Sequence, residues 1–143
     1  MENFKLVNLE DTEVLAKRVA DLIDTPKVIA LIGELGAGKT TFTKALINQL
    51  GSSDIPSSPS FVLENLYQTS KGEVSHWDLY RLSAPPEELL ERLGAGNNTI
   101  IEWADKFPGL IQLADIVIRF SIDNINEHNG IERRAEISVN RHD

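Results

Sequence analysis

The feature that most constrains the fold is a glycine-rich loop at residues 33–41, with the sequence GELGAGKTT. It matches the pattern G-x-x-x-x-G-K-[ST], which is typical of phosphate-binding loops. Residues 28–32, just before it, form a continuous apolar and β-branched run, which predicts a strand buried on both faces. Residues 41–50 have the apolar spacing of a helix, and Gly51 is a stop signal for it. Strand, glycine loop and helix in this order are the context that the motif requires, so the sequence predicts an α/β fold.

The residue types in this loop suit the phosphates of a nucleotide. Glycines let the backbone curve so that successive N–H groups point at phosphate oxygens, and the helix N-terminus adds partial positive charge. Lys39 would reach the terminal phosphates, and the Thr40 hydroxyl would bind magnesium. The alternative is a glycine-rich turn without a ligand, which the strand–loop–helix context disfavours. We therefore expect a site for a nucleoside triphosphate and magnesium.

Length and composition limit what surrounds that site. With 143 residues, the chain is expected to form a single domain, residues 1–143, with a substantial core. Its 14 basic and 22 acidic residues give a net charge of −8, which is poorly suited to holding a nucleic-acid backbone without a partner. The absence of cysteine excludes disulfides and cysteine–zinc sites. Residues 1–5 lack the apolar core of a signal peptide and no stretch approaches 18 apolar residues, so we expect a cytoplasmic protein with no membrane partner.

The N-terminal segment predicts a strand and a helix. Residues 4–7 alternate weakly between apolar and polar, and a helix is expected to begin at Asp11 or Thr12 and to end before Pro26. The stretch from Leu9 to Thr12 would lie near the nucleotide if this helix packs beside the central strand. A simple helix cap is the alternative, and the sequence alone favours it.

The middle of the chain departs from a simple alternation of strands and helices. Residues 51–60 are polar and contain prolines, which predicts either a loop that responds to a γ-phosphate or a plain surface connection. Residues 61–68 and 73–80 are strand-like and flank a short turn with Gly72, which predicts an antiparallel hairpin. The expected fold class is therefore a P-loop NTPase-like three-layer α/β sandwich, with a mixed central sheet that includes this hairpin.

Two acidic residues follow strand-like runs and are candidates for the chemistry. Asp78 could orient the attacking water or hold magnesium through water. Glu102 ends an apolar strand at residues 99–103, and an acid at the carboxyl end of a strand beside the loop strand is typical of a magnesium ligand. The alternative for Glu102 is a strand-edge acid paired with a lysine. His76 is more often a structural residue than a base in such a context, and Arg81 could either compensate phosphate charge or pair with an acid.

The last third of the chain predicts the far side of the sheet. Residues 86–93 suggest a short helix with a proline at its start, and residues 108–109 interrupt the chain. Residues 116–122 and 131–139 alternate as half-exposed strands. Arg133 and Arg134 could border the nucleotide, but periodicity alone favours positions facing water.

Four motifs occur in the order that is typical of one family. The chain resembles the TsaE (YjeE) family over nearly its whole length. The motifs are the loop at 33–41, Ser58-Pro59-Ser60-Phe61, His76-Trp77-Asp78-Leu79-Tyr80-Arg81 and Ile101-Glu102-Trp103. The resemblance implies a bacterial P-loop ATPase required for the threonylcarbamoyl modification of adenosine in tRNAs that read codons beginning with A. It would bind and hydrolyse Mg-ATP to support turnover of the TsaB–TsaD heterodimer.

The resemblance also implies how that pathway is divided. TsaC or its relative makes threonylcarbamoyl-adenylate, TsaD performs the transfer, and ATP hydrolysis resets the complex between turnovers. The chain would contact tRNA only indirectly, through the complex. Alone it would be a monomer or a weak oligomer.

The same resemblance assigns site residues. Thr40 and Glu102 would hold magnesium, and Asp78 would support hydrolysis together with Lys39. Leu9 and Arg133 are the nearest matches to nucleotide-contacting positions outside the loop. The residues that would bind the phosphates are Gly36, Ala37, Gly38, Lys39, Thr40 and Thr41.

Five further residues can be compared with the family pattern. The loop at Ser58 and Pro59 would be the switch-like segment, and Trp103 would lie near the nucleotide or a partner surface. Ser60 stands where threonine is usual and Trp77 where phenylalanine is usual. Ser60 keeps the hydroxyl, so neither departure argues against activity.

A kinase, a GTPase and a nucleotide-gated binding module are the alternatives to an ATPase. A small-molecule kinase of this fold needs a substrate pocket and an arginine-bearing lid, and no insertion is long enough to supply both clearly. A GTPase is disfavoured because neither an Asn-Lys-x-Asp nor an Asp-x-x-Gly motif occurs. A nucleotide-gated binding module, in which hydrolysis is incidental, stays open as an alternative.

Overall fold

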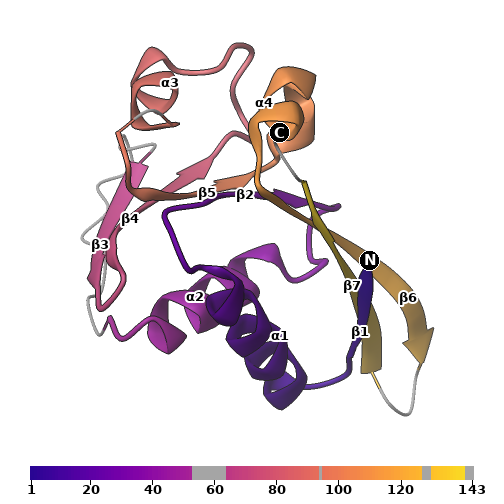
Figure 1. The fold of residues 1–143 in the computed structure, drawn as a ribbon. Helices are drawn as coiled ribbons and strands as arrows, with labels where there is room; N and C mark the ends of the chain where they lie inside the picture. Colours follow the sequence, from indigo (N-terminus) through magenta and orange to yellow (C-terminus); the bar gives the residue numbers. More distant parts are fainter. Residues whose placement is uncertain (53–63, 94, 127–129, 141–143) are drawn as a thin grey trace.

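The computed structural model describes residues 1–52, 64–93, 95–126 and 130–140. Strands and helices alternate along most of the chain (Figure 1). The elements in chain order are β1 (Glu2–Leu6), α1 (Leu9–Leu22), β2 (Val28–Ile32), α2 (Lys39–Gln49), β3 (Glu64–Thr69), β4 (Gly72–Asp78), α3 (Glu87–Leu93), β5 (Asn98–Glu102), the 3-10 helix η1 (Ala104–Lys106), α4 (Pro108–Leu113), β6 (Ile116–Asn126) and β7 (Gly130–Val139).

The strands of the described residues form one seven-stranded sheet in the order β1-β7-β6-β2-β5-β4-β3. Strand β2, which leads into the glycine loop, is parallel to both neighbours, with Leu31 opposite Glu102 of β5 and Ile118 of β6. Strand β4 is parallel to β5, whereas β3, β7 and β1 are antiparallel to the strands they pair with. The mixed sheet and its antiparallel hairpin are thus confirmed.

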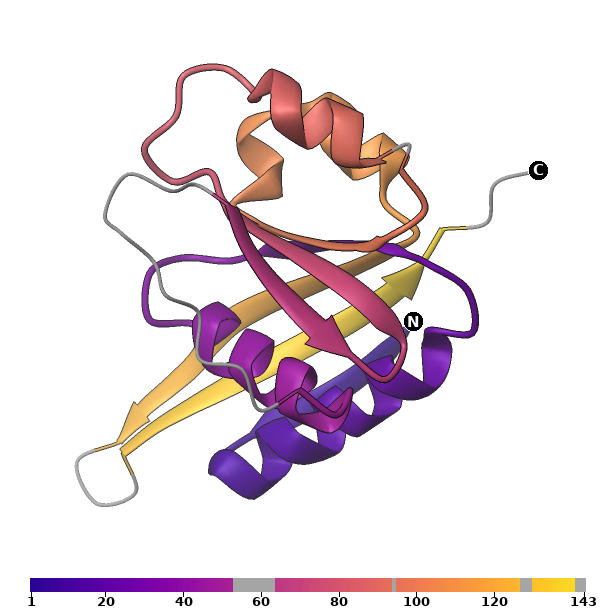
Figure 2. The ribbon, with the colours of Figure 1, turned by 90° about the vertical axis from the view of Figure 1, so that its left-hand side faces the viewer.

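Helices cover both faces of this sheet (Figures 1 and 2). Helices α1 and α2 pack on one face, and α3 and α4 lie on the other. Consecutive residues of β5 contribute to the hydrophobic cores on the two faces of the sheet. Ile100 belongs to the core that contains Leu15 and Phe42. Ile101 belongs to the core that contains Leu89. Side chains that alternate along a strand point to opposite faces, so a central strand must be apolar throughout. The predicted three-layer α/β sandwich is confirmed.

Helix α1 begins earlier than predicted. Its first residue is Leu9, and Asn8 is the N-cap. The Asn8 side chain accepts a hydrogen bond from the Asp11 backbone N–H at 3.0 Å, and the Asp11 carboxylate accepts one from the Asn8 N–H at 3.3 Å. This reciprocal capping box stabilises the first turn with the acid at the third helical position. The prediction of a start at Asp11 or Thr12 was therefore wrong, because it took an acid inside the first turn for the cap.

The elements around the loop and hairpin differ in detail from the predictions. Helix α2 begins at Lys39, inside the motif, rather than at residue 41. Strand β4 ends at Asp78, because the Asp78 carboxylate accepts a hydrogen bond from the Tyr80 N–H at 3.0 Å and the chain turns there. The predicted strand residues 61–63 and the motif at residues 58–61 lie outside the described residues.

Pro108 begins a helix instead of interrupting the chain. It occupies the first turn of α4, where a missing N–H costs nothing because that N–H would have no partner within the helix. The short α4 packs against η1 and β2 and helps to cover the second face of the sheet. None of the described helices is long and apolar enough to cross a membrane.

Candidate nucleotide site

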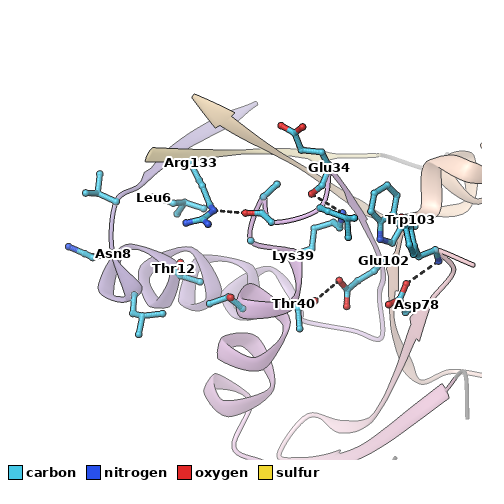
Figure 3. Close-up of a pocket in the computed structure, with 18 residues that line it drawn as sticks. Leu6, Asn8, Thr12, Glu34, Lys39, Thr40, Asp78, Glu102, Trp103 and Arg133 are labelled. Carbon is cyan, nitrogen blue, oxygen red and sulfur yellow. Dashed lines mark hydrogen bonds between the residues drawn. The ribbon is translucent and has the colours of Figure 1, made fainter. Parts of the chain in front are cut away.

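A cavity of about 440 Å³ opens at the carboxyl ends of β2, β4 and β5, beside the N-terminus of α2 (Figure 3). In open α/β sheets this edge is where ligands bind. Five segments that are distant in sequence contribute to the cavity. Its lining consists of Leu6, Val7, Asn8, Leu9, Thr12, Glu34, Leu35, Gly36, Ala37, Gly38, Lys39, Thr40, Thr41, Asp78, Tyr80, Glu102, Trp103 and Arg133.

The backbone of the glycine loop is shaped for an anion. Gly38 is the N-cap of α2 with φ +110°, a left-handed conformation that favours glycine. No side chain caps α2, so the N–H groups of its first turn are free to bind a ligand in the cavity. At Gly33, a β-carbon would lie 2.7 Å from the Phe120 carbonyl oxygen, so a larger residue would displace the loop. These donors fit the phosphate groups that the motif predicts.

Lys39 is folded into the base of the loop. Its side chain is buried, and its ammonium group donates hydrogen bonds to the carbonyl oxygens of Gly33 and Glu34. The same nitrogen lies 3.6 Å from the centroid of the Trp103 ring. Burial lowers the pKa of Lys39, and nearby carboxylates, chiefly Glu102, oppose that shift. The loop therefore holds a cationic donor beside the N–H groups of α2.

Thr40 and Glu102 meet at the mouth of the loop. The Thr40 hydroxyl donates a hydrogen bond to Glu102 Oε1 at 3.1 Å, and Glu102 is only 3% exposed (Figure 3). Its second oxygen contacts His76, and among the described residues no lysine forms an ion pair with it, so the alternative of a lysine-paired acid was wrong. A hydroxyl and a carboxylate are the ligand types that magnesium takes from a protein when phosphates and waters complete its shell. In the part of the chain that the structure describes, no cluster of three or more acidic or imidazole side chains could hold a metal ion by itself. A magnesium ion at Thr40 and Glu102 would therefore need phosphates and waters as its other ligands.

Asp78 reaches the same cavity from the neighbouring strand. It lies opposite Glu102 in the parallel pairing of β4 and β5, and its side chain is exposed at the cavity. The sheet thus brings together the two acids that the sequence singled out. Arg81, in contrast, is exposed and does not line the cavity.

Two residues remote in sequence complete the rim. Leu9, the first residue of α1, is 68% exposed and lines the cavity. Arg133 projects from β7 (Figure 3). Arg133 donates a hydrogen bond through Nε to the Gly36 carbonyl oxygen at 2.6 Å. The prediction from periodicity that Arg133 faces water was wrong, because its side chain crosses to the glycine loop. Arg134, the next residue, pairs instead with Asp123 at 2.9 Å.

Sequence reasoning missed part of the lining. Leu6, Val7 and Asn8 border the cavity because β1 delivers the chain to the α1 N-terminus beside the loop. The signal that could have placed them is the Asn-x-x-Asp capping box. Tyr80 was also missed; its ring lies 4.8 Å from the Trp103 ring. Trp103 has φ 62°, a backbone conformation that is rare for a bulky residue and often marks a functional site.

Comparisons with known proteins identify the family of this chain. The protein-family model described as "Threonylcarbamoyl adenosine biosynthesis protein TsaE" matches residues 6–135. A protein of Aquifex aeolicus named "tRNA threonylcarbamoyladenosine biosynthesis protein TsaE" is 45% identical over 112 residues, which cover 74% of this chain and 81% of that protein. The protein of the same name from Haemophilus influenzae is 36% identical over 120 residues, 80% of this chain and 73% of its own.

A solved structure is also similar. The crystal structure of Bacillus subtilis YdiB superposes with a TM-score of 0.69 at 28% sequence identity. The match covers 97% of this chain and 86% of that one. Because the family model matches residues 6–135 and the two relatives named above are 45% and 36% identical over more than two thirds of this chain, the chain belongs to the TsaE family.

Proposed function

We propose that this protein binds and hydrolyses Mg-ATP to support the threonylcarbamoyl modification of adenosine in tRNA, in tRNAs that read codons beginning with A. The observation that carries the proposal is the meeting of Thr40 Oγ1 and Glu102 Oε1 at 3.1 Å, beside the open N-terminus of α2. N–H groups that could bind phosphate and side chains that could hold magnesium then line one cavity. The relatives named for threonylcarbamoyladenosine biosynthesis supply the biological context.

Each site residue has a role in this proposal. The N–H groups of residues 36–41, from Gly36 and Ala37 through Thr41, would bind the phosphates, and Lys39 would compensate their charge. Thr40 and Glu102 would hold magnesium, which when bound neutralises charge on the phosphate oxygens. Asp78, exposed at the cavity, would orient the water for attack.

The rim would position the rest of the nucleotide. Leu9 offers an exposed apolar side chain at one side of the cavity, and the Arg133 guanidinium is fixed on the loop at the other. An apolar surface suits the base, and a guanidinium suits the phosphates. We propose that both contact the nucleotide directly.

We propose the TsaB–TsaD heterodimer as the partner. The net charge of −8 opposes direct binding of a polyanion, so tRNA would be held by the complex and reached only indirectly. In this proposal residues 1–143 act as a single cytoplasmic ATPase domain, monomeric or weakly oligomeric when alone. Hydrolysis would reset the complex between rounds of transfer.

The test uses the purified protein with and without the TsaB–TsaD pair. We expect Mg-dependent ATP binding, slow hydrolysis alone, and a changed rate or affinity when the pair is added. A protein that phosphorylates a metabolite without partners would instead be a kinase. No response of either hydrolysis or binding to the pair would overturn the proposal.

A further inference from the structure

Glu102 is held from two sides by residues of different elements. Its Oε1 accepts a hydrogen bond from Thr40 of α2 at 3.1 Å, and its Oε2 lies 2.6 Å from Nε2 of His76. His76 is on β4, two residues before Asp78, and is 9% exposed. It does not line the cavity, whereas Glu102 does. His76 therefore contacts the acid from behind, on the side away from a bound nucleotide.

The chemistry of this contact identifies which imidazole nitrogen carries a proton. A carboxylate only accepts hydrogen bonds, so a separation of 2.6 Å requires a proton on Nε2. Nδ1 is buried and has no hydrogen-bond partner among the described residues. A bare nitrogen lone pair without a partner is tolerated better than a buried N–H without one. His76 thus donates through Nε2 to Glu102.

This donation limits how the Glu102 side chain can turn. A glutamate has three rotatable side-chain bonds, and a strand by itself would leave its carboxylate several orientations. The pairing of β4 with β5, in which His76 lies opposite Ile100, fixes the distance between imidazole and carboxylate. With Oε2 engaged by His76, Oε1 is the oxygen that faces Thr40. The two strands and α2 together define one orientation of the acid.

We propose that His76 is a positioning residue, which orients Glu102 for the divalent cation that accompanies the bound nucleotide. The inference rests on the proposed function, because it assigns the cation to Thr40 and Glu102. Groups that hydrogen-bond to metal ligands fix their orientation, and their loss typically weakens metal binding 10–100-fold. His76 acts through Glu102 and touches neither cation nor nucleotide.

The test compares His76→Leu, which removes the donor, with His76→Gln, whose side-chain amide can replace it. Binding of a non-hydrolysable ATP analogue is measured over a range of magnesium concentrations. We expect His76→Leu to raise the magnesium concentration at half-effect by about tenfold or more, and His76→Gln to recover most of the loss. Analogue affinity without magnesium should stay within about twofold of wild type, because no nucleotide contact is removed.

Thr99→Val is the matched control. Thr99 is fully buried on β5, the strand of Glu102, and its hydroxyl has no hydrogen-bond partner among the described residues. The variant therefore shows the effect of a buried substitution that removes no hydrogen bond to Glu102. Its magnesium dependence should equal that of wild type. An unchanged magnesium dependence in His76→Leu would overturn the inference, as would a loss that His76→Gln does not recover.

Two further results separate this inference from the proposed function. If analogue binding by the wild-type protein does not depend on magnesium, the proposed function is refuted and the inference falls with it. If wild type depends on magnesium and His76→Leu shows the same dependence, only the inference is overturned. If His76→Leu does not fold, nitrogen NMR of the wild-type imidazole decides, assigned with the other two histidines, His128 and His142, substituted. A proton on Nε2 supports the inference, and a proton on Nδ1 alone overturns it.

Discussion

The Lys39 ammonium lies 3.6 Å from the centroid of the Trp103 ring and donates to the Gly33 carbonyl of its own loop. A cation against an aromatic face is stabilised when it is shielded from water. Trp103 can take this position because its backbone is left-handed, directly after β5. The residue after the magnesium-ligand candidate thus covers the lysine of the glycine loop.

Replacing this lysine should weaken nucleotide binding strongly. Lys39→Met keeps a long buried side chain but lacks the charge, and a hydrogen bond to a charged group is worth about 1.5–3 kcal/mol. We therefore expect affinity for an ATP analogue to fall by about 10–100-fold, measured by fluorescence titration or calorimetry. Lys44→Met, an exposed lysine on the same helix, is the control and should bind as wild type does. Equal affinity of Lys39→Met and wild type would contradict the assignment of the loop.

Lys39 should also leave a mark on stability at alkaline pH. Burial lowers the pKa of Lys39 in the folded protein below the usual 10.5, which the unfolded chain keeps. At a pH between the folded and the unfolded pKa, the unfolded chain therefore binds more protons than the folded protein. The free energy of unfolding contributed by Lys39 should then rise with pH in the window just below 10.5. Urea unfolding of wild type and Lys39→Met across this range should give a stability difference that shifts in favour of wild type. We expect the stability difference between wild type and Lys44→Met to stay constant with pH. The same constancy for Lys39→Met would contradict the prediction.

Removing the carboxylate of Glu102 should separate metal binding from nucleotide binding. Glu102→Ala is expected to weaken the magnesium dependence of analogue binding more than the affinity measured without magnesium. It should also lower the free energy of unfolding by about 1–3 kcal/mol, because Thr40 and His76 lose their acceptor. Asp78→Asn is the comparison: its side chain is exposed, so we expect slower hydrolysis with magnesium dependence retained. An unchanged magnesium titration in Glu102→Ala would remove Glu102 from the metal site.

Arg133 and Arg134 form a natural pair for testing the rim. Arg133 bonds to the glycine loop, whereas Arg134 pairs with Asp123 away from it. Arg133→Ala should weaken binding of an ATP analogue by about tenfold, the scale of one charge-assisted hydrogen bond. Arg134→Ala should leave affinity within about twofold, because an exposed ion pair contributes little. Equal effects of the two substitutions would mean that Arg133 has no specific role at the site.

Local chemistry in the sequence determined much of the site. The loop, Lys39 and Thr40 could be predicted because a phosphate-binding turn is encoded in consecutive residues. Asp78 and Glu102 could be predicted as neighbours because parallel strands end at one edge of a sheet. The hairpin followed from two strand-like runs around a short turn.

Only the tertiary structure decided which distant residues join them. Leu9 and Arg133 reach the cavity because β1 and β7 pair at one end of the sheet, an order that no local pattern encodes. The contact between His76 and Glu102 depends likewise on the register of β4 against β5. Periodicity predicted that Arg133 faces water, because the alternation along a strand shows only the face on which a residue lies. It does not show that a long side chain can cross to a neighbouring loop, as Arg133 does to Gly36. The sequence therefore determined the chemistry of the loop, and the strand order decided its surroundings.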